Sequence, residues 1–229
     1  MRSDLDANIL REVPLFSDLN DEDIETIMHM TVRRVFNKST MIVIEEDQAD
    51  TLYIIERGSV KITRLNEDGR EVILAILGSA EFFGEMALLD GQGRSANVLA
   101  LEETVLYTLF RRDFLDVLHR FPSISIQLLR EMTSRLRKSD QQIKSLSLSD
   151  AEHRIGIALH RIAEDMGMFK MGKVVVSKMP FQQDIANMAG TSRETVSRML
   201  KSLEQKELVE RQGRRLTIND YATFTRLFG

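Results

Sequence analysis

The segment "FQQDIANMAGTSRETVSRMLKSLEQK", residues 181–206, divides into two helical patterns joined by a tight turn around Gly190. The first pattern is short. The second is longer, and its apolar residues recur every three or four positions, as on one face of a helix: Val196, Met199, Leu200 and Leu203. Two helices at this spacing with a glycine between them predict a helix-turn-helix, the arrangement that places a helix in the DNA major groove.

The outward face of the second helix carries the chemistry of base recognition. Arginine reads guanine through two hydrogen bonds, and glutamate accepts from the cytosine amino group. Thr191 is the expected helix cap, because Glu194 follows it three residues later in a capping-box pattern. We expect DNA contacts from these residues of the helix and its start: Thr191, Ser192, Arg193, Glu194, Ser197, Arg198 and Lys201.

A basic hairpin follows in "LVERQGRRLTI", where a turn at Gly213 separates two strand-like runs. Arg211, Arg214 and Arg215 suit phosphate contacts in such a wing. Residues 150–229 hold 13 lysines and arginines against 10 acids, a balance of +3, whereas the whole chain has a net charge of −4. An ordinary pair of helices with a charged face is the alternative; the glycine turn, the wing and the charge asymmetry together favour DNA binding.

Upstream of this segment, residues 123–146 show a heptad pattern that predicts a dimerisation helix. The seam positions lie three or four residues apart: Leu129, Met132, Leu136, Ser139, Ile143 and Leu146. Ser139 interrupts the apolar seam, either as a tolerated small residue or as a polar contact. The serine-rich "SLSLSD", residues 145–150, is expected to be a hinge.

The first part of the chain has the period of strands. Short runs rich in β-branched and aliphatic residues recur about every ten residues between turn signals, which predicts a sandwich or barrel. The runs are 41–46, 51–56, 59–65, 71–77, 97–101 and 104–110, and Asp68-Gly69 favours a hairpin turn. The expected fold class is α+β, with a sensor domain at 1–120, a dimerisation helix and hinge at 121–148, and a DNA-binding domain at 149–229.

Composition excludes several functions. The absence of cysteine rules out disulfides, thiol catalysis and cysteine-ligated iron–sulfur clusters. No apolar run approaches the ~20 residues of a membrane span, and the start lacks a signal-peptide core, so a cytoplasmic location without a membrane partner is expected. The four histidines fall in expected helices without metal-site spacing: His29, His119, His153 and His160. Neither a nucleophile elbow nor a phosphate loop is present, so no enzyme is predicted.

The stretch "GEMALLDGQGRSA", residues 84–96, combines an acid, an arginine, a hydroxyl residue and three glycines. A carboxylate such as Glu85 can accept from a sugar hydroxyl, and a guanidinium such as Arg94 matches a phosphate. Glycine lets the backbone approach a ligand closely. The alternative is a scaffold in which Glu85 and Arg94 pair with each other.

Together these features resemble the cyclic-AMP receptor protein/fumarate-nitrate regulator superfamily of bacterial transcription regulators, with "TSRETVSRMLKSLE" as the strongest match. The resemblance implies a cyclic-nucleotide-binding-like β-roll (jelly roll), a coiled-coil dimer helix and a winged helix-turn-helix. It implies a homodimer on palindromic double-stranded DNA, with RNA polymerase as a further partner. In nucleotide-binding members, Gly84 and Glu85 would hold the ribose 2′-hydroxyl, and Arg94 and Ser95 the cyclic phosphate.

The same resemblance assigns residues of the long helix. Arg135 falls where an arginine links the glutamate to this helix, and Ser139 and Asp140 fall where cyclic-AMP binders have Thr-Ser against the adenine. Asp140 departs from that pattern; it could accept from adenine, accept doubly from guanine, or be a solvated charge. The implied effector is cyclic AMP or cyclic GMP, with no cofactor. Alternatives are an effector-independent regulator, or a regulatory subunit acting on a protein partner.

Overall fold

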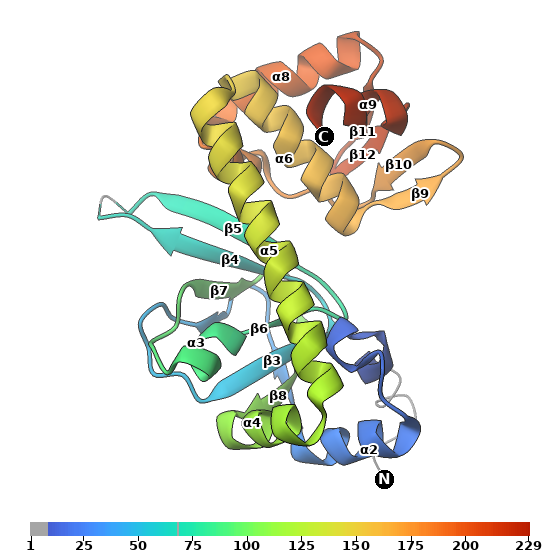
Figure 1. The fold of residues 1–229 in the computed structure, drawn as a ribbon. Coiled ribbons are helices and arrows are strands. Elements are labelled where there is room, and N and C mark those ends of the chain that lie inside the picture. The colour runs from blue at the N-terminus through green and yellow to red at the C-terminus, as the bar shows by residue number, and fades with distance from the viewer. Residues whose placement is uncertain (1–8, 68) are drawn as a thin grey trace. The chain divides into compact units, whose positions relative to one another are not determined.

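A computed structural model of the chain describes residues 9–67 and 69–229, with side chains placed for all of these except 145–148. The fold is α+β, and the chain forms two compact units (Figure 1). One unit holds the chain up to Arg64 together with Leu74–Arg137, and the other holds Leu65–Ile73 and Lys138–Gly229.

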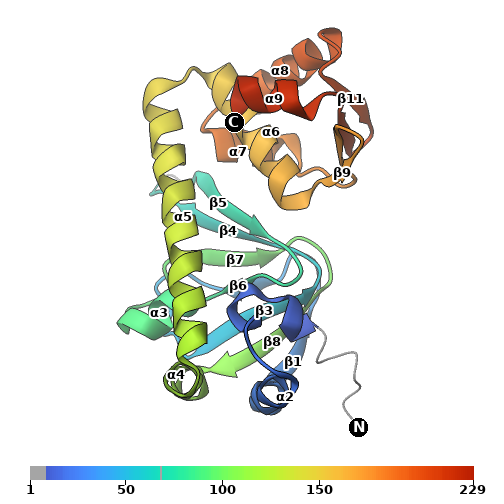
Figure 2. The same cartoon turned by 45° about the vertical axis from the view of Figure 1, so that its right-hand side comes forward.

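The first part of the chain is a β-roll with short helices. Its elements are η1 (Pro14–Phe16), α2 (Asp21–Met30), β1 (Val32–Phe36), β2 (Met41–Val43), β3 (Thr51–Arg57), β4 (Val60–Leu65), β5 (Glu71–Leu77), β6 (Phe82–Phe83), α3 (Glu85–Asp90), β7 (Asn97–Ala100), β8 (Thr104–Phe110) and α4 (Arg111–Arg120). One sheet has the order β1-β8-β3-β6 and the other β2-β7-β4-β5. Figure 2 shows β5, β4 and β7 side by side in that order.

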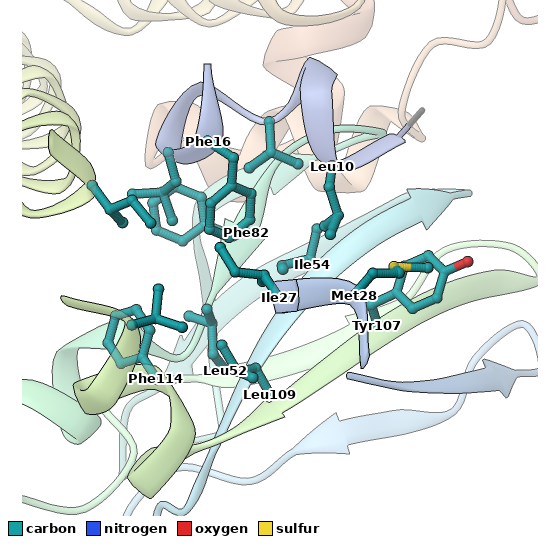
Figure 3. Packing of buried hydrophobic residues seen from close by; sticks show 14 of the residues in the cluster. Leu10, Phe16, Ile27, Met28, Leu52, Ile54, Phe82, Tyr107, Leu109 and Phe114 are labelled. Atoms are coloured by element: carbon teal, nitrogen blue, oxygen red, sulfur yellow. The ribbon is translucent and has the colours of Figure 1, made fainter. Parts of the chain in front are cut away.

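The strands β3 and β8 are buried on both faces, because each contributes side chains to two separate cores. Leu52 and Ile54 of β3 join a core with α2, α4 and the start of the long helix, whereas Ile55 faces the core between the sheets. This alternation follows from the two-residue period of a strand. Figure 3 shows Ile27 and Met28 of α2 gathered with Ile54 and other residues of the first core.

The second part of the chain begins with the long helix α5 and continues into a helical domain with a small sheet. Its elements are α5 (Pro122–Leu148), α6 (Ala151–Met166), β9 (Met168–Lys170), β10 (Lys173–Val176), α7 (Gln182–Ala189), α8 (Arg193–Gln205), β11 (Val209–Gln212), β12 (Arg215–Ile218) and α9 (Tyr221–Phe228). The strands form one antiparallel sheet of order β11-β12-β10-β9. Ile155 and Leu159 of α6 are fully buried in this domain.

All six predicted strand runs are strands in the structure, as β2, β3, β4, β5, β7 and β8. The non-helical connection before α6 is shorter than the hinge predicted at residues 145–150. The helix α5 continues to Leu148, so the break is confined to Ser149 and Asp150. Asp150 caps α6 by accepting from the backbone N–H of His153. Asp68, in the predicted hairpin turn, lies outside the described residues. Among the helices that the structure describes, none has the length and apolar composition to cross a bilayer.

Candidate functional site

Gly84 connects β6 to α3 in a conformation that requires glycine. Its φ is +89°, in the left-handed region, and a Cβ atom there would lie 2.6 Å from Nη1 of Arg94 and 3.0 Å from the Thr51 carbonyl oxygen. The helix α3 begins directly afterwards at Glu85. The backbone is therefore shaped so that the Arg94 guanidinium comes against it.

Glu85 is buried, with 2% of its surface exposed, and pairs with the long helix. Its Oε1 lies 3.1 Å from Nη1 of Arg135, and Arg135 also donates to the Phe82 carbonyl at 2.8 Å and lies over the Phe82 ring. Burial raises the pKa of Glu85, and the Arg135 charge opposes that rise. The second oxygen, Oε2, is buried without a hydrogen-bond partner among the described residues. The link from Arg135 to the glutamate, implied by the family resemblance, is present.

Arg94 is also buried, with 6% exposed, and points its guanidinium at the same turn. Nη1 donates to the Gly84 carbonyl at 3.0 Å and Nη2 to the Thr51 carbonyl at 2.8 Å. The guanidinium lies 5.6 Å from the centre of the Tyr53 ring. Burial lowers the pKa of Arg94, and nearby Tyr53, Asp50 and Glu85 oppose this. The ion-pair partner of Glu85 is thus Arg135, and Arg94 bonds backbone carbonyls instead, which differs from the internal Glu85–Arg94 pair of the scaffold alternative.

The remaining predicted ligand residues are exposed. Ser95 follows Arg94 in the chain, and its Oγ lies 3.7 Å from the sulfur of Met86. Ser139 and Asp140 are exposed on α5 and belong to the second unit. The structure therefore brings together Gly84, Glu85, Arg94 and Arg135 in one site within the first unit.

The helix α5 carries a stripe of large apolar side chains that face solvent in the single chain. Ile126, Leu129, Leu136 and Ile143 are 52%, 66%, 62% and 62% exposed. Met132, predicted in the same seam, is half-buried and packs against the core of the β-roll. Ile126 lies three residues before Leu129 and extends the exposed stripe toward the start of α5. The side chain of Leu146 lies outside the described residues.

The helix-turn-helix is formed by α7 and α8 as predicted. Gly190 ends α7 in the left-handed region with φ +58°, and the predicted apolar face of α8 is buried. The cap of α8 is Ser192, whose hydroxyl accepts from the Thr195 backbone N–H at 3.3 Å. Thr191, the predicted cap, therefore lies one residue before the helix boundary.

The face of α8 predicted to read bases is exposed. It consists of Arg193, Glu194, Ser197, Arg198 and Lys201. Hydrogen bonds from its own backbone N–H and from Ser192 lower the pKa of Glu194, which keeps this side chain a carboxylate acceptor. Arg198 donates to the Thr195 hydroxyl on its own helix at 3.3 Å.

The three wing arginines have different surroundings. Arg211 bonds Glu204 of α8 at 2.6 Å, and Arg214 donates from Nε and Nη2 to the Met179 carbonyl while stacking over Phe181. Arg215 is exposed and lines a hollow of about 190 Å³ with Glu210, Gln212 and Thr217. Arg211 and Arg214 are thus held by protein partners, whereas Arg215 is exposed, and phosphate contact by the three arginines stays a prediction.

Comparison with known proteins agrees with this two-part arrangement. The cyclic nucleotide-binding domain model matches residues 33–121, and the Crp-like helix-turn-helix domain model matches residues 153–227. A cyclic AMP receptor protein of Thermus thermophilus is 35% identical over 196 residues, which cover 86% of this chain and 88% of that protein. The chain belongs to the cyclic-AMP receptor protein/fumarate-nitrate regulator family.

Two solved structures of the family extend the comparison. The Thermus thermophilus catabolite activator protein is 32% identical with a TM-score of 0.55, covering 93% of this chain and 97% of that one. The c-di-GMP responsive global regulator CLP of Xanthomonas campestris is 25% identical with a TM-score of 0.73, covering 87% and 99%. As a family member, the chain is a DNA-binding transcription regulator with a cyclic-nucleotide-binding domain, and it is not an enzyme.

Three features of this family member were absent from the sequence predictions. The Thr51 carbonyl and the Tyr53 ring surround Arg94, and nothing in the sequence marks them, because they lie more than 40 residues before it. Ile126 belongs to the exposed stripe and could have been found from its three-residue spacing to Leu129.

Among the residues that the structure describes, no group of three or more His, Cys, Asp or Glu could hold a metal ion.

Proposed function

We propose that the chain acts as a homodimer whose affinity for a palindromic DNA site is controlled by a cyclic nucleotide bound in the β-roll. The observation that carries the proposal is Glu85, a buried carboxylate with one oxygen bound to Arg135 and the other without a hydrogen-bond partner in the part of the chain that the structure describes. Buried polar atoms normally have partners, so this carboxylate oxygen fits a polar ligand. A ribose hydroxyl could donate to that oxygen.

Arg94 is the residue proposed to hold the cyclic phosphate, together with Ser95. Its two terminal nitrogens donate to neutral carbonyls, and a phosphate is a stronger acceptor for a guanidinium than a carbonyl is. The exposed Ser95 hydroxyl next to it can donate a further hydrogen bond. These residues fit the group that the family binds.

The identity of the base is proposed to depend on Ser139 and Asp140, which are exposed on α5. The Thermus relative is named for cyclic AMP, and the Xanthomonas regulator is described as responsive to c-di-GMP. We therefore test three nucleotides by calorimetry on the full chain: cyclic AMP, cyclic GMP and cyclic di-GMP. Saturable binding of a cyclic mononucleotide is expected; binding of cyclic di-GMP alone, or of none, would contradict this site assignment.

The exposed stripe of α5 supports the dimer, because contiguous apolar surface of this kind marks an interaction face. A two-fold dimer would present two copies of α8 to successive major grooves, roughly 34 Å apart. Effector binding in the β-roll, to which Arg135 ties α5, would alter the packing of the two α5 helices and so the presentation of α8. RNA polymerase is the proposed protein partner of the dimer on DNA.

Arg198→Ala should relax base preference at one symmetric position of the DNA site. The side chain is exposed on α8 and held by a weak 3.3 Å hydrogen bond to Thr195, so it can turn to reach a guanine edge, and such a contact contributes about 1–3 kcal/mol. Binding of duplexes substituted at each position measures the effect, with Lys206→Ala as a control that removes one exposed charge at the end of α8. Equal loss on specific and random DNA would contradict base reading by Arg198.

Arg215 and Arg214 should behave differently when each is replaced by glutamine. Arg215→Gln should weaken binding to every sequence and reduce the slope of log affinity against log salt by about 1 per protomer, because the exposed guanidinium of Arg215 would contact phosphate. Arg214→Gln should instead lower the free energy of unfolding by about 1 kcal/mol, since it loses the Met179 carbonyl. Salt titrations and thermal melts distinguish the two; the opposite pattern would overturn the assignment.

A further inference from the structure

Arg154 makes three hydrogen bonds that join two separate segments of the DNA-binding domain. It lies in the first turn of α6 and is half-buried. Its Nη1 donates to the carbonyl of Ser149, between α5 and α6, at 2.8 Å. Its Nε and Nη2 donate to the carbonyls of Ala189 and Gly190, at the end of α7, at 2.9 and 3.2 Å.

The chemistry of these contacts requires an arginine. The last carbonyls of a helix lack intrahelical donors and carry the negative end of the helix dipole, so a cation there is favourable. A guanidinium presents its donors as a rigid planar fork and can serve three carbonyls at once, whereas a lysine ammonium is a compact charge on a flexible stem. Only two residues separate Gly190 from Arg193, where α8 begins.

We propose that Arg154 is a positioning residue for DNA reading: it fixes the turn between α7 and α8 to the connection between α5 and α6. A shift of that connection would then carry the start of α8 with it, because both ends are held by one planar group. The packing of α6 against α7, in which Ile155 and Ile185 are both buried, supports the two helices but does not involve the Ser149 carbonyl. The proposal rests on the DNA-reading role of α8 and not on the effector.

The test replaces Arg154 with lysine in the full chain, which keeps the charge and removes the fork. The probes are a duplex selected in vitro by the parent protein and a duplex of equal composition with its half-sites scrambled, both under the nucleotide condition used for selection. The specificity ratio, selected over scrambled affinity, should fall about tenfold or more, the equivalent of one misplaced base contact. Arg226→Lys is the matched control, because Arg226 donates to Thr223 on its own helix α9 and does not join separate segments in the part of the chain that the structure describes.

All affinities are measured well below the melting temperature of each variant. A merely structural role would leave the specificity ratio unchanged, either because both affinities are kept or because both fall by the same factor. An unchanged ratio would overturn the proposal. If the lysine variant melts too early, Arg154→Gln, which retains one donor nitrogen in a planar amide group, replaces it with the same expectation. A parent protein without any sequence preference would contradict the role of α8 itself, a failure distinct from that of Arg154.

Discussion

Leu136→Glu is expected to separate the dimer into monomers and to abolish binding to palindromic DNA at micromolar protein. Leu136 is 62% exposed in the single chain and lies in the middle of the stripe on α5. In a two-fold dimer the substitution would place two carboxylates in one apolar seam, where burying unpaired charge costs several kcal/mol. A monomer would engage only one half-site and lose the gain from binding two sites together.

Sedimentation equilibrium measures this result, and Ser134→Glu is the matched control. Ser134 is exposed on α5 and lies two residues from Leu136, so it points to the opposite side of the helix. The control should remain a dimer with the parent's affinity for DNA. A parent protein that is monomeric at micromolar concentration, or a Leu136→Glu protein that stays dimeric, would contradict the proposed interface.

Arg94→Leu is expected to reduce effector affinity by roughly 2–3 kcal/mol or more, because it removes a charge-assisted contact to phosphate from a buried site. The same change leaves the Gly84 and Thr51 carbonyls without their donor, so some loss of stability should accompany it. The two effects must be separated, since a weaker fold could also bind less ligand.

Arg111→Leu provides that separation. Arg111 also donates to a backbone carbonyl of the same domain, that of Leu88, at 3.0 Å, but lies on α4 outside the proposed site. Calorimetry and thermal melts of both variants should show effector loss for Arg94→Leu alone. Unchanged effector affinity in a folded Arg94→Leu protein would exclude a phosphate-binding role for this arginine.

The local features of the helix-turn-helix could be predicted because periodicity and a glycine specify them. Val196 and Leu203 are buried as their spacing requires, and Gly190 takes the left-handed conformation that few other residues favour. The cap of α8 was misplaced by one residue because Thr191 and Ser192 are both good caps. Only the backbone conformation at Ser192 decides between them.

The position of Met132 shows that α5 is apolar on two faces. A helix that packs on a domain core and also forms a dimer seam has apolar residues on two faces. Apolar residues three or four positions apart can then belong to either face. Met132 satisfies the heptad with Leu129 and Leu136, yet the β-roll core lies on its side of the helix. Burial against another element cannot be read from the period of one helix.

The chemistry of the effector site was predictable, but its geometry was not. Glu85 and Arg94 stand out by residue type, whereas α3 between them is six residues long and too short to show a helical period. The hydrogen bond of Arg214 could not be predicted either, because its acceptor, the Met179 carbonyl, lies 35 residues away in the sequence. Contacts between distant segments depend on how the chain folds back, which composition does not specify.

The most direct test of nucleotide control is the affinity of the full chain for its selected DNA duplex, measured by fluorescence anisotropy with and without cyclic AMP or cyclic GMP. One of these nucleotides should raise the affinity about tenfold or more, within the usual range of allosteric coupling, and Arg94→Leu should abolish the increase while leaving the basal affinity unchanged. Equal DNA affinity under all conditions for the parent protein would contradict control by a cyclic mononucleotide.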